Sequence, residues 1–295
     1  MKNKFIGTGV ALVTPFTKKG EVDYIALEKL VKFQINNGVD YLVILGTTGE
    51  PATLNKEEKK KVIAKIVAVN KGKLPLVIGI GGNNTQQVVD EIKTTELKEF
   101  DAILSVSPYY NRPTQQGIYT HFKQIAEATE KAIIIYNVPH RTGKNVAPET
   151  ILKLAKDCKN IIAIKDAASD IQQTFELIKN KPEEFLIISG DDSLALTSVL
   201  AGAAGVISVI GQGMPKEFTT MINLGLEGKP KEAFQKHYEL MRLTDLIFRE
   251  GNPAGIKTIL KQKNICETVV RLPLVEASSK LQKLIGQSII KLESN

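Results

Sequence analysis

The sequence has little of several residue types. Its 295 residues include no tryptophan and only two cysteines, and aromatic residues make up 6%. Cys158 and Cys266 lie far apart and lack metal-type spacing, so we expect neither a disulfide framework nor a metal site. No apolar run approaches the ~18 residues of a membrane span, and the first residues contain no apolar signal core. We therefore expect a cytoplasmic protein that does not bind a membrane.

Charge of neither sign dominates strongly, although the formal net charge is +7. Residues 228–295 supply most of it, with 12 Lys and Arg against 7 Asp and Glu, a difference of +5. Nucleic-acid binding would need a basic patch with a recognisable module or stacking aromatics. These charges are instead spread among acids along helical segments. We interpret them as solvated helix faces and expect no nucleic-acid partner.

Short β-rich apolar runs recur along the chain. They are Val10–Val13, Tyr41–Leu45, Leu76–Ile80, Ala102–Val106, Ile133–Tyr136, Ile161–Ile164, Leu186–Ile188 and Gly205–Val209. Each run is continuous rather than alternating, as is typical of a parallel strand covered on both faces. Helical patterns fill the gaps, with Asp23 as an expected N-cap, Asn55 and Glu58 as a capping box, and Pro148 in a first turn. The eight units predict an α/β fold, a (β/α)8 TIM barrel.

An open, doubly wound sheet is the alternative to a barrel, but it favours fewer strands and a nucleotide loop after the first. Gly79-Ile80-Gly81 lacks a third spaced glycine and follows the third strand, so we interpret it as a tight turn. From about Pro230 the periodicity is helical without strands. We therefore expect a catalytic barrel over 1–228 and a helical region over 229–295 that packs on this barrel or on a neighbour.

Barrel enzymes place their sites at the carboxyl ends of the strands. Four segments at such ends carry polar side chains: Gly46-Thr47-Thr48-Gly49-Glu50, Ser107 to Pro113, Asn137 to Thr142, and Lys165-Asp166. Lys165 directly follows an apolar run, where limited hydration disfavours the ammonium form. A neutral amine can attack a ketone and form a Schiff base, which acts as an electron sink. A lysine paired with Asp166 or with another acid is the alternative.

Other side chains at these ends admit two interpretations each. Tyr136 ends the preceding strand and could move protons to a developing imine, or it could be a core tyrosine. Thr47 and Thr48 offer donors to a carboxylate, or they simply form a glycine-rich turn. Arg141 could bind a second carboxylate or form a surface ion pair. Tyr109 and Tyr110 are adjacent aromatic residues in an expected exposed loop. Tyr110 could reach across a subunit boundary, or both residues could form an ordinary interface contact.

Together these segments resemble the dihydrodipicolinate synthase family of pyruvate-dependent lyases. The resemblance rests on Gly46 to Glu50, Tyr109 to Pro113, Tyr136 to Pro139 with Arg141, and Lys165, and it covers nearly the whole chain. It implies that Lys165 forms an imine with pyruvate. It also implies a proton relay of Thr47, Tyr136 and Tyr110, with Tyr110 donated by the partner subunit of a homotetramer built from dimers.

The same resemblance implies the remaining substrate contacts. Thr48 would bind the pyruvate carboxylate, Arg141 the carboxylate of L-aspartate 4-semialdehyde, and the backbones of Gly190 and Ile207 would line the pocket. The product would be 4-hydroxy-tetrahydrodipicolinate in the diaminopimelate route of lysine biosynthesis. No cofactor and no metal is implied.

Relatives that are inhibited by lysine bind it at the dimer interface. Asn83 and Tyr109 match that site, but Lys56 and Gln87 stand where His and Glu are expected. Lys56 adds positive charge near a cationic effector, and Gln87 removes a negative partner. We expect lysine to inhibit weakly or not at all.

Two further functions compete with the synthase. One is another pyruvate aldolase of the same superfamily, such as N-acetylneuraminate lyase or a 2-keto-3-deoxy sugar acid aldolase. Arg141 suits a dicarboxylate product, whereas a sugar-chain aldolase needs polar groups for hydroxyls. The other is a catalytically silent barrel that acts as a binding protein, which the complete set of polar residues argues against.

Overall fold

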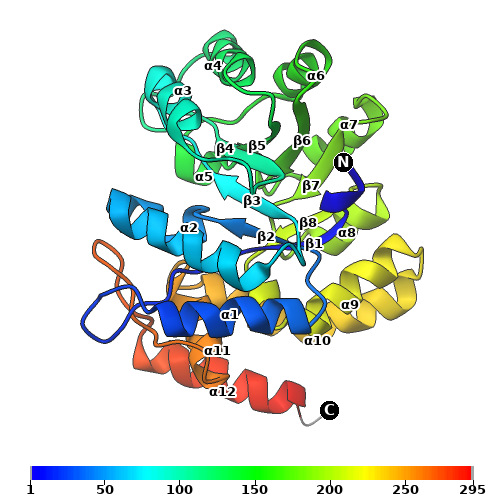
Figure 1. Cartoon of the computed structure of the whole chain (residues 1–295). Helices are drawn as coiled ribbons and strands as arrows, with labels where there is room; N and C mark the ends of the chain where they lie inside the picture. The colour runs from blue at the N-terminus through cyan, green and yellow to red at the C-terminus, as the bar shows by residue number, and fades with distance from the viewer. Residues whose placement is uncertain (1, 294–295) are drawn as a thin grey trace.

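Eight parallel strands close into a barrel in chain order in the computed structural model, which describes residues 2–293 (Figure 1). The strands are β1 (Gly7–Ala11), β2 (Tyr41–Ile44), β3 (Leu76–Gly79), β4 (Ala102–Val106), β5 (Ala132–Asn137), β6 (Ile161–Asp166), β7 (Leu186–Ser189) and β8 (Gly205–Ser208). β1 pairs with both β2 and β8, which completes the circle. The predicted (β/α)8 barrel is confirmed.

The bounds of β1 differ from the sequence prediction. The strand covers Gly7–Ala11, whereas the apolar run suggested Val10–Val13. A Cβ placed on Gly9 would lie 2.1 Å from the ring of Tyr41, so the glycine leaves room for this ring inside the barrel. Glycine is disfavoured in strands, so the residue composition does not predict that β1 begins at Gly7.

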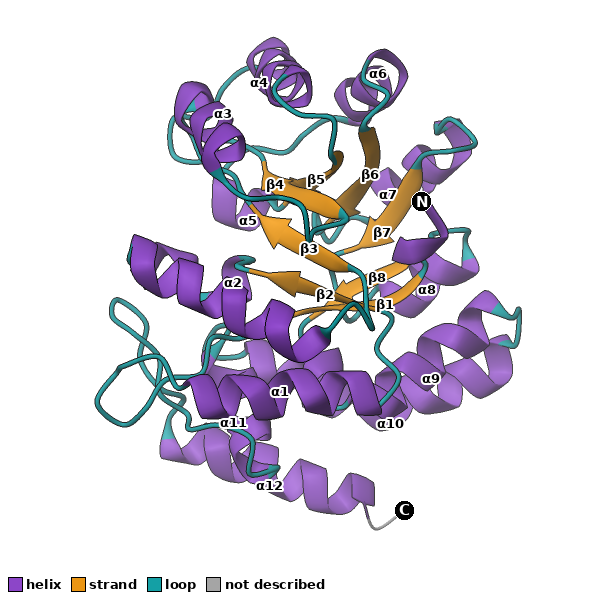
Figure 2. Ribbon diagram, in the orientation of Figure 1, coloured by secondary structure: helices purple, strands orange, loops and turns teal. Residues whose placement is uncertain are grey.

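Helices cover the outside of the barrel, as Figure 2 shows. Those that follow the strands are α1 (Tyr24–Asn36), α2 (Lys56–Asn70), α3 (Thr85–Thr94), α4 (Gln115–Glu127), α5 (Pro139–Thr142), α6 (Pro148–Asp157), α7 (Ile171–Asn180), α8 (Ala195–Leu200) and α9 (Pro215–Leu226). Asp23 caps α1 through the amides of Ile25 and Ala26. Asn55 and Glu58 form the expected capping box at α2. Short 3-10 turns occur at Lys2–Phe5, Thr47–Gly49, Pro51–Thr53 and Ile210–Gln212.

The strands are buried on both faces, and their side chains form two cores. Ile133 and Ile135 of β5 pack outward under the helices, whereas Ala132, Ile134 and Tyr136 pack inside the barrel. Successive side chains of a strand point to opposite faces. This alternation determines which residue at each strand end reaches the barrel mouth.

Three helices follow the barrel: α10 (Pro230–Phe248), α11 (Ala254–Gln262) and α12 (Ser279–Glu293). They contact one another, and α10 packs along α9 and α8; α11 and α12 lie at the bottom of the view in Figure 1. Their buried residues, such as Leu240, Ile256 and Leu281, belong to the same hydrophobic cluster as the outer barrel core. The region thus packs on its own barrel, and a domain boundary near residue 228 stays a prediction.

Within residues 2–293 no helix is long and apolar enough to cross a membrane. The same part of the chain has no group of three or more His, Cys, Asp or Glu side chains placed to hold a metal ion. Cys158 and Cys266 are buried free thiols.

Candidate active site

A cavity of about 330 Å³ lies among the carboxyl ends of the strands. Its wall consists of Ala11, Gly46, Thr47, Thr48, Leu104, Tyr136, His140, Arg141, Lys165, Ala167, Ser169, Gly190, Asp191, Asp192, Ser193, Val209, Phe248 and Asn252. Most of these residues end a strand or follow one closely. The cavity therefore lies where barrel enzymes have their active sites.

Lys165 lies on the cavity wall at the end of β6. It shares the inward face of the strand with Ala163, and only 5% of it is exposed. β5 and β6 are paired so that Tyr136 stands beside Lys165, and Nζ lies 4.4 Å from the centre of the tyrosine ring. Among the described residues Nζ has no hydrogen bond or ion pair. The amine is therefore held in place by packing and is open to a ligand.

Asp166 does not pair with Lys165, which removes the alternative interpretation of the lysine. The carboxylate accepts hydrogen bonds from Asn137 at 3.0 Å, Gln173 at 3.3 Å and Thr174 at 3.4 Å. Burial raises the pKa of Asp166, and these hydrogen bonds oppose the rise. Its position follows from alternation, since the residue after an inward lysine points out of the barrel.

The turn after β2 brings two threonines to the cavity. Thr47 is exposed there, whereas Thr48 is buried and its Oγ1 accepts a hydrogen bond from Nδ2 of Asn252 at 2.8 Å. Leu45 and Glu50, on either side of the turn, have positive φ angles of 56° and 53°. Such a conformation costs a non-glycine residue roughly 1–3 kcal/mol and is found preferentially at functional sites.

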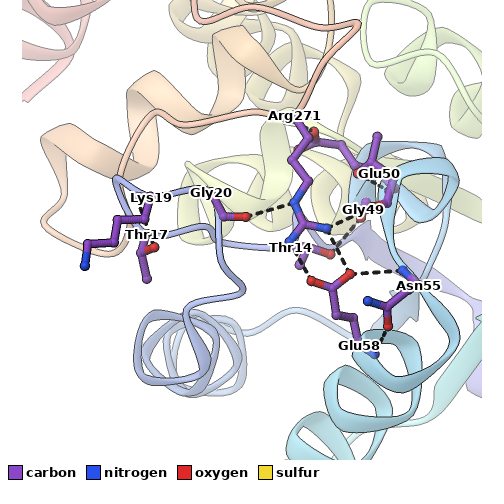
Figure 3. Close-up of polar contacts among 10 residues, drawn as sticks. Thr14, Thr17, Lys19, Gly20, Gly49, Glu50, Asn55, Glu58 and Arg271 are labelled. Carbon is purple, nitrogen blue, oxygen red and sulfur yellow. Dashed lines mark hydrogen bonds and ion pairs between the residues drawn. The ribbon is translucent and has the colours of Figure 1, made fainter.

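Contacts from the C-terminal region hold this turn in its conformation. Glu50 accepts hydrogen bonds from Nζ of Lys257 at 2.7 Å and from the backbone amide of Arg271 at 2.9 Å. Arg271 also makes a two-pronged ion pair with Glu58 and donates to the carbonyl of Gly20, as Figure 3 shows. Segments far apart in sequence thus fix the backbone that carries Thr47 and Thr48.

Arg141 lies in α5, directly after β5, and lines the cavity. Its guanidinium forms no ion pair with any described residue, so nothing in this part of the chain supports the alternative of a surface ion pair. Burial lowers the pKa of the adjacent His140, and the charge of Arg141 lowers it further. The cavity therefore has a cationic side that suits a carboxylate.

Gly190 gives Lys165 its space. A Cβ on Gly190 would lie 3.0 Å from Cε of Lys165 and 2.7 Å from Cβ of Ala167. Ile207, also predicted to line the pocket, is buried in the barrel interior on β8, and Val209 lines the cavity two positions further on.

Tyr110 is not among the residues that line this cavity within the described part of one chain. It is 88% exposed in the loop after β4, with a positive φ of 70°. The neighbouring carbonyl of Tyr109 accepts a hydrogen bond from Nδ2 of Asn83 at 3.2 Å. Gln87 lies on α3 and Lys56 opens α2, both exposed.

Sequence reasoning missed several residues of the wall, and four of them carry polar or aromatic side chains of interest: Asp191, Asp192, Phe248 and Asn252. Asp191 and Asp192 follow β7, and the strand-end rule could have found them. Asp192 accepts hydrogen bonds from the amides of Val209 and Ile210, and burial raises its pKa to about 6. Phe248 and Asn252 belong to the C-terminal helical region, which the strand-end rule does not cover.

Comparisons with known proteins give one family. Residues 4–291 match the model of the dihydrodipicolinate synthetase family. A 4-hydroxy-tetrahydrodipicolinate synthase of Flavobacterium psychrophilum is 58% identical over 277 residues, which cover 94% of each chain. The crystal structure of dihydrodipicolinate synthase from Thermotoga maritima has a TM-score of 0.96 at 38% identity, covering 98% of this chain and 99% of that one. A monomeric dihydrodipicolinate synthase variant has a TM-score of 0.95 at 38% identity and covers 98% and 97%.

Proposed function

The chain belongs to the dihydrodipicolinate synthetase family, and we propose that Lys165 carries the 4-hydroxy-tetrahydrodipicolinate synthase reaction through a Schiff base. The enzyme is a lyase that condenses pyruvate with L-aspartate 4-semialdehyde on the diaminopimelate route to lysine. The observation that carries the proposal for Lys165 is a buried lysine that has no ionic partner within residues 2–293 and lies against Tyr136 at the barrel mouth.

The chemistry follows from a lysine side chain on the wall of this cavity. Lys165 attacks the ketone of pyruvate, and loss of water gives an imine that withdraws electrons from the neighbouring methyl carbon. That carbon loses a proton and attacks the aldehyde of the second substrate. The protons move through Thr47 and Tyr136, which line the same cavity, and through Tyr110 of a second subunit. Thr48 binds the pyruvate carboxylate, and the backbones of Gly190 and Ile207 shape the pocket.

Arg141 supports the choice of aldehyde. The guanidinium of Arg141 lines the wall without an ion pair to the described part of the chain, and it can hold the carboxylate of aspartate semialdehyde in a bidentate contact. The relatives named above are synthases, so the family favours this reaction over that of N-acetylneuraminate lyase or a sugar acid aldolase.

Two measurements test the assignment. Purified protein is assayed with both substrates while an added reductase and NADPH report the product. Separately, borohydride is added with pyruvate, and a covalent adduct on Lys165 is sought by mass spectrometry. Turnover together with the adduct is expected. An adduct without turnover would move the assignment to the sugar acid aldolases, and no adduct would refute the Schiff base.

Two variants separate the roles of Lys165 and Arg141. Lys165→Ala should abolish the adduct, because the cavity wall has no second lysine among the described residues. Arg141→Ala should keep the adduct and lose condensation by at least about a hundredfold, as expected for a bidentate charge-assisted contact. Full condensation activity in the arginine variant would remove the basis for the aldehyde assignment.

The protein is further proposed to form a homotetramer of two dimers in the cytoplasm. The argument for assembly is Tyr110, a large exposed aromatic on a strained loop, which can serve the relay only in a second subunit's cavity. Weak or absent inhibition by lysine is also proposed, because Lys56 and Gln87 give a cationic effector little negative charge. Strong inhibition at low lysine concentration in a steady-state titration would refute this.

A further inference from the structure

The C-terminal region completes the wall of the catalytic cavity. Phe248 ends α10 and Asn252 precedes α11, and both line the cavity together with the strand-end residues. Asn252 lies 204 positions from the threonine that it contacts. The cavity thus has one wall that the barrel strands do not supply.

The hydrogen bond between Asn252 and Thr48 has a defined direction. Nδ2 of Asn252 donates to Oγ1 of Thr48 at 2.8 Å, and the two residues are 8% and 3% exposed. A hydroxyl has one proton and two acceptor lone pairs. Because the amide occupies a lone pair, the hydroxyl proton must point elsewhere, and no described residue accepts it. An acceptor in the cavity is then its natural partner.

The other end of the amide argues against a purely structural asparagine. Buried amide groups normally find partners for both ends. Oδ1 of Asn252 is buried, and none of the described residues hydrogen-bonds to it. Within the described residues, therefore, the amide nitrogen of Asn252 has a hydrogen-bond partner, Thr48 at the edge of the cavity, and the amide oxygen has none.

We propose that Asn252 is a positioning residue for pyruvate, whose amide orients the Thr48 hydroxyl so that its proton meets the pyruvate carboxylate. The proposal rests on the function proposed above, in which Thr48 binds that carboxylate. It assigns to the C-terminal helical region a direct part in the first half of the reaction.

The sharpest test is Asn252→Asp, which has the same shape but cannot donate when ionised. Thr48 then donates its proton to the new carboxylate and loses it for pyruvate. We expect kcat/KM for pyruvate to fall about tenfold, the loss of one charge-assisted hydrogen bond, while kcat/KM for the aldehyde stays within about twofold.

A pH profile separates this effect from structural damage. As the pH falls from about 8 to about 6, the buried introduced carboxyl gains a proton and becomes a donor again. The pyruvate kcat/KM of the variant, taken relative to the parent at each pH, should then recover. The ratio to the parent is used because both proteins carry the other ionisable groups of the wall: Tyr136, His140, Arg141, Lys165, Asp191 and Asp192. A ratio that does not change with pH would overturn the proposal.

A double-mutant cycle tests whether Asn252 acts through Thr48. Asn252→Ala should weaken pyruvate use in the parent but have no further effect in Thr48→Val. Effects that multiply in the double variant, or a parent-like Asn252→Ala, would contradict the proposal. Thr258→Val is the matched control, because Thr258 is buried in α11 and its hydroxyl donates to the carbonyl of Ala254, a bond within its own helix. If Asn252→Ala does not fold, the pH profile of Asn252→Asp relative to the parent tests the proposal by itself.

Borohydride trapping keeps this proposal apart from the function on which it rests. The Asn252 variants should still form the Lys165 adduct at saturating pyruvate, with a higher half-saturating concentration. Absence of the adduct in the parent would refute the Schiff-base function itself. An adduct in the parent together with unchanged saturation in the variants would refute only the role of Asn252.

Discussion

Gly190 controls the space around the reactive amine. A methyl group there would meet Cβ of Ala167 at 2.7 Å, and that atom has no rotamer through which to move away. The backbone at Gly190 or Ala167 must therefore shift, and the flexible Lys165 side chain, at 3.0 Å, must give way as well. Catalytic groups tolerate little displacement, since about 1 Å can cost on the order of a hundredfold in rate.

We therefore predict that Gly190→Ala lowers the rate of pyruvate adduct formation by at least about tenfold while the protein stays folded. The rate is measured by quenching with borohydride at timed intervals. Gly286→Ala in α12 is the control, because its Cβ would lie 3.5 Å from Gln262, an ordinary contact. A Gly190→Ala protein with the parental rate would contradict the steric argument.

Asp192 gives the protein a pH dependence of stability. Its folded pKa is about 6 because burial disfavours the charge, compared with an ordinary value of 3.8. Between these values the folded chain binds a proton that the unfolded chain does not. The folded state is thus favoured at low pH, and this contribution is lost as the pH rises through about 6.

Asp192→Asn should remove that dependence. Relative to the variant, the parent is predicted to lose on the order of 2 kcal/mol of unfolding free energy between about pH 4.5 and about pH 7.5. Urea denaturation of both proteins at the two pH values measures it. An equal change in both proteins would show that folding does not shift the pKa of Asp192, and a change of opposite sign would show that folding lowers it.

At the scale of elements, a buried ion pair joins α11 to the turn after β2. Lys257 and Glu50 are 0% and 1% exposed at their side chains and lie 2.7 Å apart. Burial lowers the pKa of Lys257, and Glu50 opposes the change. Such a pair adds little net stability, but losing one partner leaves an uncompensated buried charge.

Lys257→Met is accordingly predicted to destabilise the protein by roughly 3–5 kcal/mol, and the added Glu50→Gln should restore much of the loss. Urea unfolding gives the free energies. Lys60→Met, which breaks an exposed pair with Glu57, is the control and should have no measurable effect. If the double variant were less stable than Lys257→Met, the explanation by an unpaired charge would be wrong.

At the scale of the whole molecule, assembly is predicted to complete the site. Tyr109→Glu should shift sedimentation toward smaller species and lower turnover together, because a charge at the proposed contact is desolvated on association. Tyr110→Phe should lower turnover without changing sedimentation, because only the hydroxyl enters the relay. A fully active protein that sediments as a monomer would contradict a cross-subunit tyrosine. The related monomeric variant makes the measurement necessary.

Local pattern alone determined much of this protein. Continuous apolar runs predicted the eight strands, because strands buried on both faces need such runs. Lys165 and Tyr136 were predicted to lie at the barrel mouth because the strand-end rule needs only the position of a residue relative to its own strand. The start of β1 was predicted three residues too late, at Val10 and not at Gly7, because glycine has a low strand propensity.

Only the tertiary structure decided how the site is completed. The sequence gives no sign that Asn252 meets Thr48 or that Lys257 meets Glu50, more than 200 positions away. Those contacts depend on how α10 and α11 fold back on the barrel mouth, which a periodic pattern does not encode. Periodicity specifies which face of an element is buried, whereas the partner of a buried polar group is set by the packing of the entire chain.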